Sequence, residues 1–161
     1  MRRPASPVYL FEWFSVGALS LLFPTLVLAQ ASSGVVQRVI DGDTIVVSGV
    51  GPVRLIGVNS PEIADLRKPI QHFGTEATAF TRQIADGQAV ELKFEGSRRD
   101  RYNRTRAYVY LPDGTMLNAE LIRQGYAYVD KQSAFSKMEE FRALQRDAMT
   151  HSRGLWRRSA K

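Results

Sequence analysis

The sequence predicts a small α+β domain in which five β-strands close into a Greek-key barrel and about three α-helices pack on it. Short apolar runs separated by turn residues predict the strands, and segments with a helical apolar period lie among them. The 161 residues are 44% hydrophobic and 24% charged, which is typical of a globular domain. This composition excludes a disordered tail, a collagen-like fibre and a polytopic membrane protein.

The first half of the barrel is predicted to be a three-stranded antiparallel meander. Residues 35–40 form the first strand, and Asp41 and Gly42 make a tight turn. Residues 44–47 continue as the second strand. A further turn at 49–52 leads into the third strand, at residues 53–58.

The second half alternates helices with two more strands. Phe73, Ala77, Phe80 and Ile84 share one helix face, and that helix ends near Gly87. Alternating apolar residues predict strands around 90–94 and 107–111, with a turn at 112–115.

Two helices complete the domain. We expect Asn118 to cap a short helix that ends at Gly125. Ser136 and Glu139 have the spacing of a capping box at the start of the last helix.

Residues 1–31 have the form of a secretory signal peptide. A basic start at Arg2 and Arg3 precedes a stretch without charge at 13–29, and Ala29 and Ala31 are small residues at the positions that a signal peptidase reads. We expect cleavage before Ser32, which leaves 32–161 as the exported domain. The alternative is an uncleaved N-terminal membrane anchor.

The composition of the chain limits the kinds of catalytic and metal-binding chemistry that it can carry. The net charge of +6 favours a polyanionic partner. The absence of cysteine excludes a disulfide framework, a thiolate zinc site and a Cys nucleophile. Since the chain has only 2 histidines, neither in a recognisable motif, a His dyad or a His-rich zinc site is also disfavoured. Carboxylate, amide and guanidinium chemistry remain.

Oxygen donors gather at two places that an antiparallel meander brings to one edge. Asp41 and Asp43 flank the first turn, and Asn59, Ser60 and Glu62 follow the third strand. Oxygen-only donors suit a hard cation such as Ca²⁺. Asp-Gly is also a common hairpin turn with no further role.

Arginines supply the opposite charge. Arg54 interrupts an apolar strand, and an inward-facing arginine is costly unless it meets an anion. Residues 98–106 hold five arginines around Tyr102, which indicates either a solvated loop or phosphate contact with base stacking. A hard cation, a carboxylate and guanidinium groups together suit phosphodiester cleavage.

Six ordered blocks resemble the staphylococcal nuclease (thermonuclease) family: 39–44 (VIDGDT), 53–62 (VRLIGVNSPE), 73–77 (FGTEA), 100–104 (DRYNR), 118–127 (NAELIRQGYA) and 154–156 (GLW). The resemblance implies an OB-fold barrel at 32–161. It also implies Ca²⁺-dependent hydrolysis of DNA and RNA with little sequence specificity, leaving 3′-phosphates. A monomer without a stable protein partner is expected.

The resemblance also implies roles for individual residues. Asp43, Asn59 and the backbone carbonyl of Ser60 match the metal ligands, and Asp41 matches a nearby carboxylate. Glu62 matches the group that activates water, and Arg54 and Arg104 match the arginines that stabilise the transition state. Arg101 and Tyr102 match the pair that contact a nucleotide's terminal phosphate and base, and Lys68 is a further predicted substrate-binding residue.

Three positions depart from the family's pattern. Asn59 replaces a metal-binding Asp, so Ca²⁺ affinity should fall. Asn103 stands where the family has Gly, which predicts a positive φ. Lys131 stands where a pocket tyrosine is usual, so the base preference is open. The alternative function, suggested by Asn59, is a catalytically weakened OB-fold that only binds nucleic acid.

Overall fold

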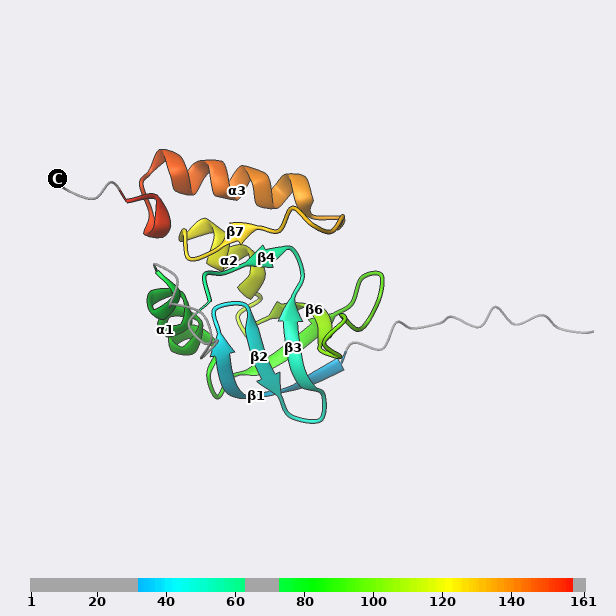
Figure 1. The fold of residues 1–161 in the computed structure, drawn as a ribbon. Coiled ribbons are helices and arrows are strands. Elements are labelled where there is room, and N and C mark those ends of the chain that lie inside the picture. Colours follow the sequence, from blue (N-terminus) through cyan, green and yellow to red (C-terminus); the bar gives the residue numbers. More distant parts are fainter. Residues whose placement is uncertain (1–31, 63–72, 158–161) are drawn as a thin grey trace, which may run out of the picture.

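The computed structural model describes residues 32–62 and 73–157, and within them five strands close into a barrel in the order β1-β2-β3-β6-β5 (Figure 1). The barrel strands are β1 (Ser32–Asp41), β2 (Thr44–Val47), β3 (Gly51–Leu55), β5 (Ala89–Lys93) and β6 (Thr105–Tyr110). β1 pairs with β5 through its first residues and with β2 through its last ones. The parallel pairing of β3 with β6 closes the barrel, so the predicted meander and the α+β barrel are both confirmed.

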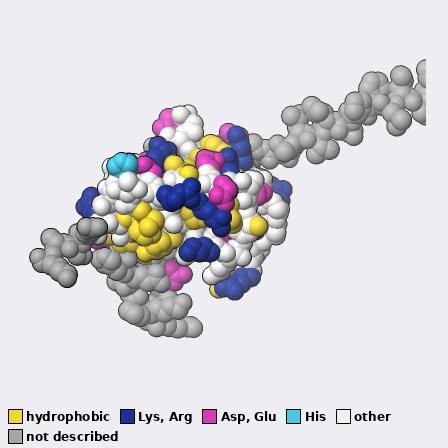
Figure 2. All heavy atoms as spheres, turned by 90° about the horizontal axis from the view of Figure 1, so that it is seen from above, with side chains coloured by type: hydrophobic (Ala, Val, Ile, Leu, Met, Phe, Trp, Pro, Cys, Tyr) yellow, Lys and Arg dark blue, Asp and Glu magenta, His cyan; other side chains and the backbone are white. Residues whose placement is uncertain are grey.

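Three helices cover the barrel. They are α1 (Gly74–Ala85), α2 (Leu117–Arg123) and α3 (Met138–Thr150), and a 3₁₀ turn, η1 (Gly154–Trp156), follows. α1 packs beside β1, whereas α2 lies between the barrel and α3 (Figure 1). The side of α3 that faces away from the barrel carries basic and acidic side chains together (Figure 2). No helix in the described ranges is both long and apolar enough to span a membrane.

The predicted end of the third strand, at residue 58, is wrong, because the strand ends at Leu55 and the chain then turns. Gly57 has a φ of 75°, and a Cβ there would lie 2.6 Å from the Phe135 ring. Only glycine satisfies both conditions without strain. The chain then forms β4 (Val58–Asn59), which pairs with β7 (Tyr128–Val129) instead of extending β3. This break carries Asn59 across the end of the barrel.

Asn118 does not cap a helix, contrary to expectation. It lies inside the first turn of α2, where it is fully buried. Its Oδ1 accepts a hydrogen bond from the Val109 N–H (2.9 Å), and its Nδ2 donates to the carbonyls of Ile56 (3.0 Å) and Ala107 (3.2 Å). A buried amide thus joins α2, β6 and the turn after β3.

The predicted capping box is also absent, since α3 starts at Met138 without a side-chain cap. The Ser136 hydroxyl instead donates to Glu95 Oε2 (2.6 Å), its N–H donates to Oε1 (2.7 Å), and the Tyr108 hydroxyl donates to Oε2 (2.7 Å). Burial alone would raise the pKa of Glu95, but these hydrogen bonds outweigh it and lower that pKa below 4.5. Burial and the bond to Glu95 raise the pKa of Tyr108 to about 12.

Replacing Glu95 with Gln is expected to lower the free energy of unfolding at pH 7 by about 1 kcal/mol, because charge-assisted bonds become neutral ones. A lowered carboxyl pKa stabilises the fold above its unfolded value, and that stability is lost as pH falls through the folded value. The difference from wild type should therefore shrink as pH falls below 4.5. Urea unfolding at several pH values measures it, with the exposed Glu91→Gln as the control. A difference that does not change with pH would contradict this explanation.

Candidate active site

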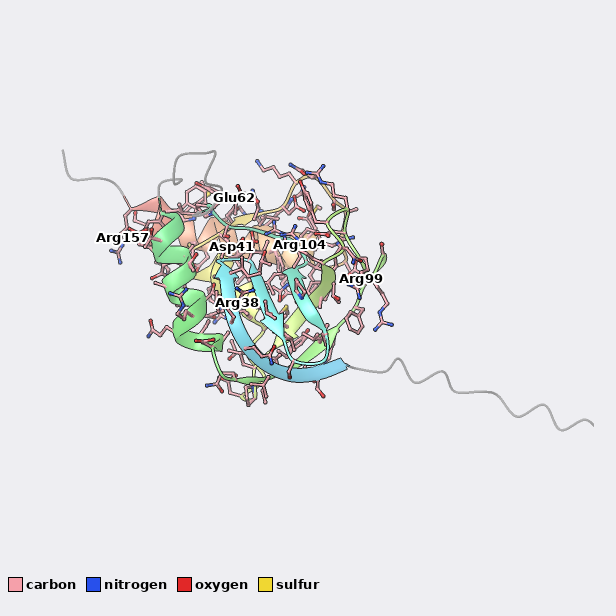
Figure 3. The ribbon with its side chains drawn as sticks, turned by 60° about the horizontal axis from the view of Figure 1, so that its bottom comes forward. Arg38, Asp41, Glu62, Arg99, Arg104 and Arg157 are labelled. Atoms are coloured by element: carbon pink, nitrogen blue, oxygen red, sulfur yellow. The ribbon has the colours of Figure 1, made fainter. Side chains whose placement is uncertain are left out.

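A polar cleft of about 520 Å³ lies at the end of the barrel where β1, β3 and β4 end. Seven of the predicted site residues line it: Asp41, Arg54, Asn59, Glu62, Arg101, Tyr102 and Arg104. Asp41, Glu62 and Arg104 lie together at this end, whereas Arg99 lies at the side of the barrel (Figure 3). A larger cavity of about 650 Å³, lined by residues of α1, α2 and the turn after β6, contains none of the predicted site residues.

The turn between β1 and β2 brings the two predicted groups of oxygen donors together. Asp43 is 2% exposed and lies behind the cleft lining. Its Oδ2 accepts a hydrogen bond from the Ser60 N–H (2.7 Å), and its own N–H donates to Asp41 Oδ1 (3.0 Å). The turn is also held from α1, where the Thr81 hydroxyl donates to the Gly42 carbonyl (2.8 Å).

Arg54 forms an ion pair with Asp43, and its NH2 donates to the Val58 carbonyl (3.0 Å). Burial and the nearby Arg104 lower the pKa of the Arg54 guanidinium below its usual value. The charge predicted to be costly inside the strand is thus neutralised by a buried carboxylate.

Burial raises the pKa of Asp41 above its usual value, although Thr44, Arg54 and Arg104 oppose the shift. The Asp41 carboxylate thus holds a proton more readily than an exposed one. An added positive charge beside it would favour its ionised form.

Arg104 is oriented by its own loop. Its Nε donates to Asp100 Oδ2 (2.7 Å), its backbone N–H donates to Oδ1 (2.9 Å), and its NH1 contacts the Thr44 hydroxyl (3.2 Å). Burial alone would raise the pKa of Asp100, but these bonds and the one from Tyr102 N–H lower it. Asn103 in this loop has a φ of 62°, so the predicted positive φ is confirmed.

Tyr102 is exposed at the rim of the cleft, with 65% of its surface accessible. The guanidinium carbons of Arg101 and Arg104 lie 4.8 and 5.3 Å from the centre of its ring. An exposed ring among cations can stack on a base while the arginines contact phosphate.

Some of the predicted site residues do not line the cleft. Ser60 is buried with Asp43, and its Oγ has no hydrogen-bond partner in the described part of the chain. Lys68 and the predicted signal peptide lie outside the described residues.

The structure adds Thr44, Asp130 and Gln132, which the sequence did not single out for the site. Thr44 links Asp43 to Arg104 through its hydroxyl (3.1 and 3.2 Å). Arg106, Asp130 and Gln132 line the cleft. Arg106 belongs to the basic run, but no sequence signal marks Asp130 or Gln132, because the pairing of β4 with β7 brings them to the cleft.

The donor set suits a hard cation. The residues predicted to hold a cation, Asp43, Asn59 and Ser60, offer only oxygen donors. A hydrogen bond joins Ser60 to Asp43 behind the cleft, and Asn59 lines the cleft. Residues 32–62 and 73–157 contain no group of three or more His, Cys, Asp or Glu placed to hold a metal ion. A cation here would therefore depend on the amide and carbonyl oxygens as well.

Comparison with known proteins identifies the family. Residues 52–158 match the model described as "Staphylococcal nuclease homologue". The chain is 35% identical over 136 residues to a thermonuclease of Staphylococcus intermedius, with 80% of this chain and 79% of the relative covered. The chain belongs to the staphylococcal nuclease family.

Other relatives agree with this family membership. A thermonuclease of Staphylococcus hyicus is 36% identical over 125 residues, covering 75% of this chain and 73% of the relative. Endonuclease YncB of Bacillus subtilis (strain 168) is 32% identical over 130 residues, covering 76% of this chain and 61% of the relative. The predicted family, its barrel and the nuclease class of enzyme are confirmed.

The match to the staphylococcal nuclease family model begins in β3 and includes Arg54, Glu62 and Arg104. Asp41 and Asp43 come from the preceding hairpin, and hydrogen bonds connect that hairpin to the matched segment through Ser60.

Proposed function

We propose that this protein is an exported, Ca²⁺-dependent nuclease that hydrolyses phosphodiester bonds in DNA and RNA and leaves 3′-phosphates. The observation that carries the proposal is the shared cleft. It brings a basic pair, Arg54 and Arg104, to the same place as the exposed carboxylate of Glu62 and the oxygen donors around Asp43. This combination is what hydrolysis of an anionic ester requires.

Asp43, Asn59 and the Ser60 carbonyl would hold Ca²⁺, with Asp41 as a nearby carboxylate. When bound, the ion would supply positive charge that orients the phosphate. It would share Asp43 with Arg54, because the two form an ion pair. Asn59 contributes no charge, which predicts weaker Ca²⁺ binding than an Asp would give.

Glu62 accepts a proton from the attacking water, whose oxygen bonds to phosphorus as the P–O5′ bond breaks. Arg54 and Arg104 donate hydrogen bonds to the phosphate oxygens and stabilise their increased charge in the transition state. Arg104 needs little reorganisation because Asp100 already orients its guanidinium. Arg104 also stabilises the departing O5′, which takes a proton from solvent water to become the 5′-hydroxyl. Arg101, Tyr102 and Lys68 hold the rest of the nucleotide.

Digestion of plasmid DNA and of RNA is expected with Ca²⁺ and should stop with a chelator. Gel electrophoresis across a series of divalent ions measures this, and end-group analysis should find 3′-phosphates. Excess Ca²⁺ added after the chelator should restore cleavage. Binding without digestion would instead support the catalytically weakened binding protein.

The proposal that the protein is exported rests on the predicted signal peptide at residues 1–31. Mass spectrometry of the protein from the cell exterior should find a chain that starts near Ser32. A retained leader would indicate the membrane-anchored alternative.

A further inference from the structure

The cleft contains three polar residues to which the proposed hydrolysis assigns no role. Arg106, Asp130 and Gln132 line it together with the proposed catalytic residues. Arg106 lies opposite Arg54 in the parallel pairing of β6 with β3, so it is next to the proposed phosphate site. We refer to these three residues as the polar wall.

Hydrogen bonds hold Asp130 in place, and its carboxylate can still accept a further one. Its backbone N–H donates to the Gly57 carbonyl (3.0 Å), and its Oδ1 accepts the Gln132 N–H (2.9 Å). No hydrogen bond to its other carboxylate oxygen is found within the described part of the chain. Against the lowering by burial, its charge raises the pKa of the nearby Arg54 guanidinium, and its remaining carboxylate oxygen can also accept N–H donors of a ligand.

Arg106 supplies the complementary group. No carboxylate lies within ion-pair distance of its guanidinium among the described residues, and its backbone is fixed by the N–H bond to the Arg98 carbonyl (2.9 Å). A guanidinium fork pairs best with two adjacent acceptors. The polar wall therefore supplies both a donor fork and a carboxylate to the cleft.

We propose that the polar wall contacts the base beside the scissile phosphate and favours guanine at that position. This inference rests on the proposed nuclease function and specifies its substrate preference. Guanine has adjacent N–H donors at N1 and N2 for Asp130, and acceptors at O6 and N7 for Arg106. Cytosine and adenine each offer one amino group, and thymine or uracil offers a single N–H between two carbonyls.

The substrate at this position must be single-stranded or locally unpaired. Only then are the N1 and N2 groups of guanine free of their pairing partner. Tyr102, exposed at the rim of the same cleft, offers a ring on which an unpaired base can stack.

Partial digestion of a pool of short randomised single-stranded DNA, followed by sequencing of the fragments, tests the preference. Guanine should be enriched at one position beside the cut by at least about fivefold. Asp130→Asn and Arg106→Lys should reduce this enrichment, since the first removes the carboxylate and the second the fork. The charge-matched changes Asp86→Asn and Arg82→Lys, at exposed positions on or next to α1, should leave it unchanged.

Equal cleavage beside all four bases, or enrichment that persists in both polar-wall variants, would overturn the inference while leaving the nuclease function intact. Calorimetric titration with GMP, AMP, CMP and TMP in Ca²⁺ gives a readout independent of cleavage. Tighter binding of GMP, lost in Asp130→Asn, supports the preference, and equal binding of all four overturns it. Absence of Ca²⁺-dependent digestion of any substrate would instead reject the proposed function.

Discussion

Replacing Glu62 with Gln is expected to lower kcat by about 10²–10⁴-fold, because an amide cannot accept a proton from the attacking water. Glu62 is exposed at the cleft, so the isosteric change should leave the fold and substrate binding nearly unaltered. The loss should thus appear in kcat and not in KM. Initial rates on a defined oligonucleotide at saturating Ca²⁺ measure both constants.

The matched control is Glu76→Gln, an exposed carboxylate in the first turn of α1. It carries the same change of charge and should retain wild-type kcat. Arg54→Ala should also be strongly impaired, with a loss of stability as well, because it leaves the buried Asp43 without its ion pair. Full activity in both Glu62→Gln and Arg54→Ala would refute the proposed mechanism.

Replacing Asn118 with Ala is expected to lower the free energy of unfolding by about 3 kcal/mol or more. The change removes three hydrogen bonds at a fully buried position and leaves the Val109 N–H without its partner. Each buried polar group left unsatisfied costs roughly 1–3 kcal/mol. Urea unfolding followed by circular dichroism measures the loss.

Gln83→Ala, at an exposed position of α1, is the control and should change stability by less than about 0.5 kcal/mol. A loss below about 1 kcal/mol in Asn118→Ala would show that the buried amide contributes little net stability. Because Asn118 bonds to the Ile56 carbonyl, its loss should also disturb the turn that leads to Asn59 and weaken Ca²⁺ binding.

Local patterns predicted most elements closely. The second strand is found at the predicted residues, and the helix whose apolar face begins at Phe73 runs from Gly74 to Ala85. Both rest on periodicity and turn residues, which act over a few neighbouring positions. The positive φ of Asn103 was predictable for the same reason, since it depends on one residue's backbone.

The predicted helix caps were wrong where a polar side chain bonds to a distant residue. Asn118 and Ser136 have residue types and spacings that suit helix caps, yet each bonds across the fold, to Val109 and Glu95 respectively. A side chain that could cap a nearby helix can instead bond to a distant buried group, and that tertiary hydrogen bond can be the more favourable one. The early end of the third strand has a similar cause, because the Phe135 ring lies against Gly57.

Residue type, order and spacing were enough to predict the barrel class, a site of oxygen donors and guanidinium groups, and the resemblance to the staphylococcal nuclease family. Which of these groups come into contact depends on the tertiary structure. It paired Arg54 with Asp43, buried Asp43 behind the cleft, and brought Asp130 beside the proposed catalytic residues through β7. Contacts between residues far apart in the chain form only when the barrel closes, and no local pattern encodes them.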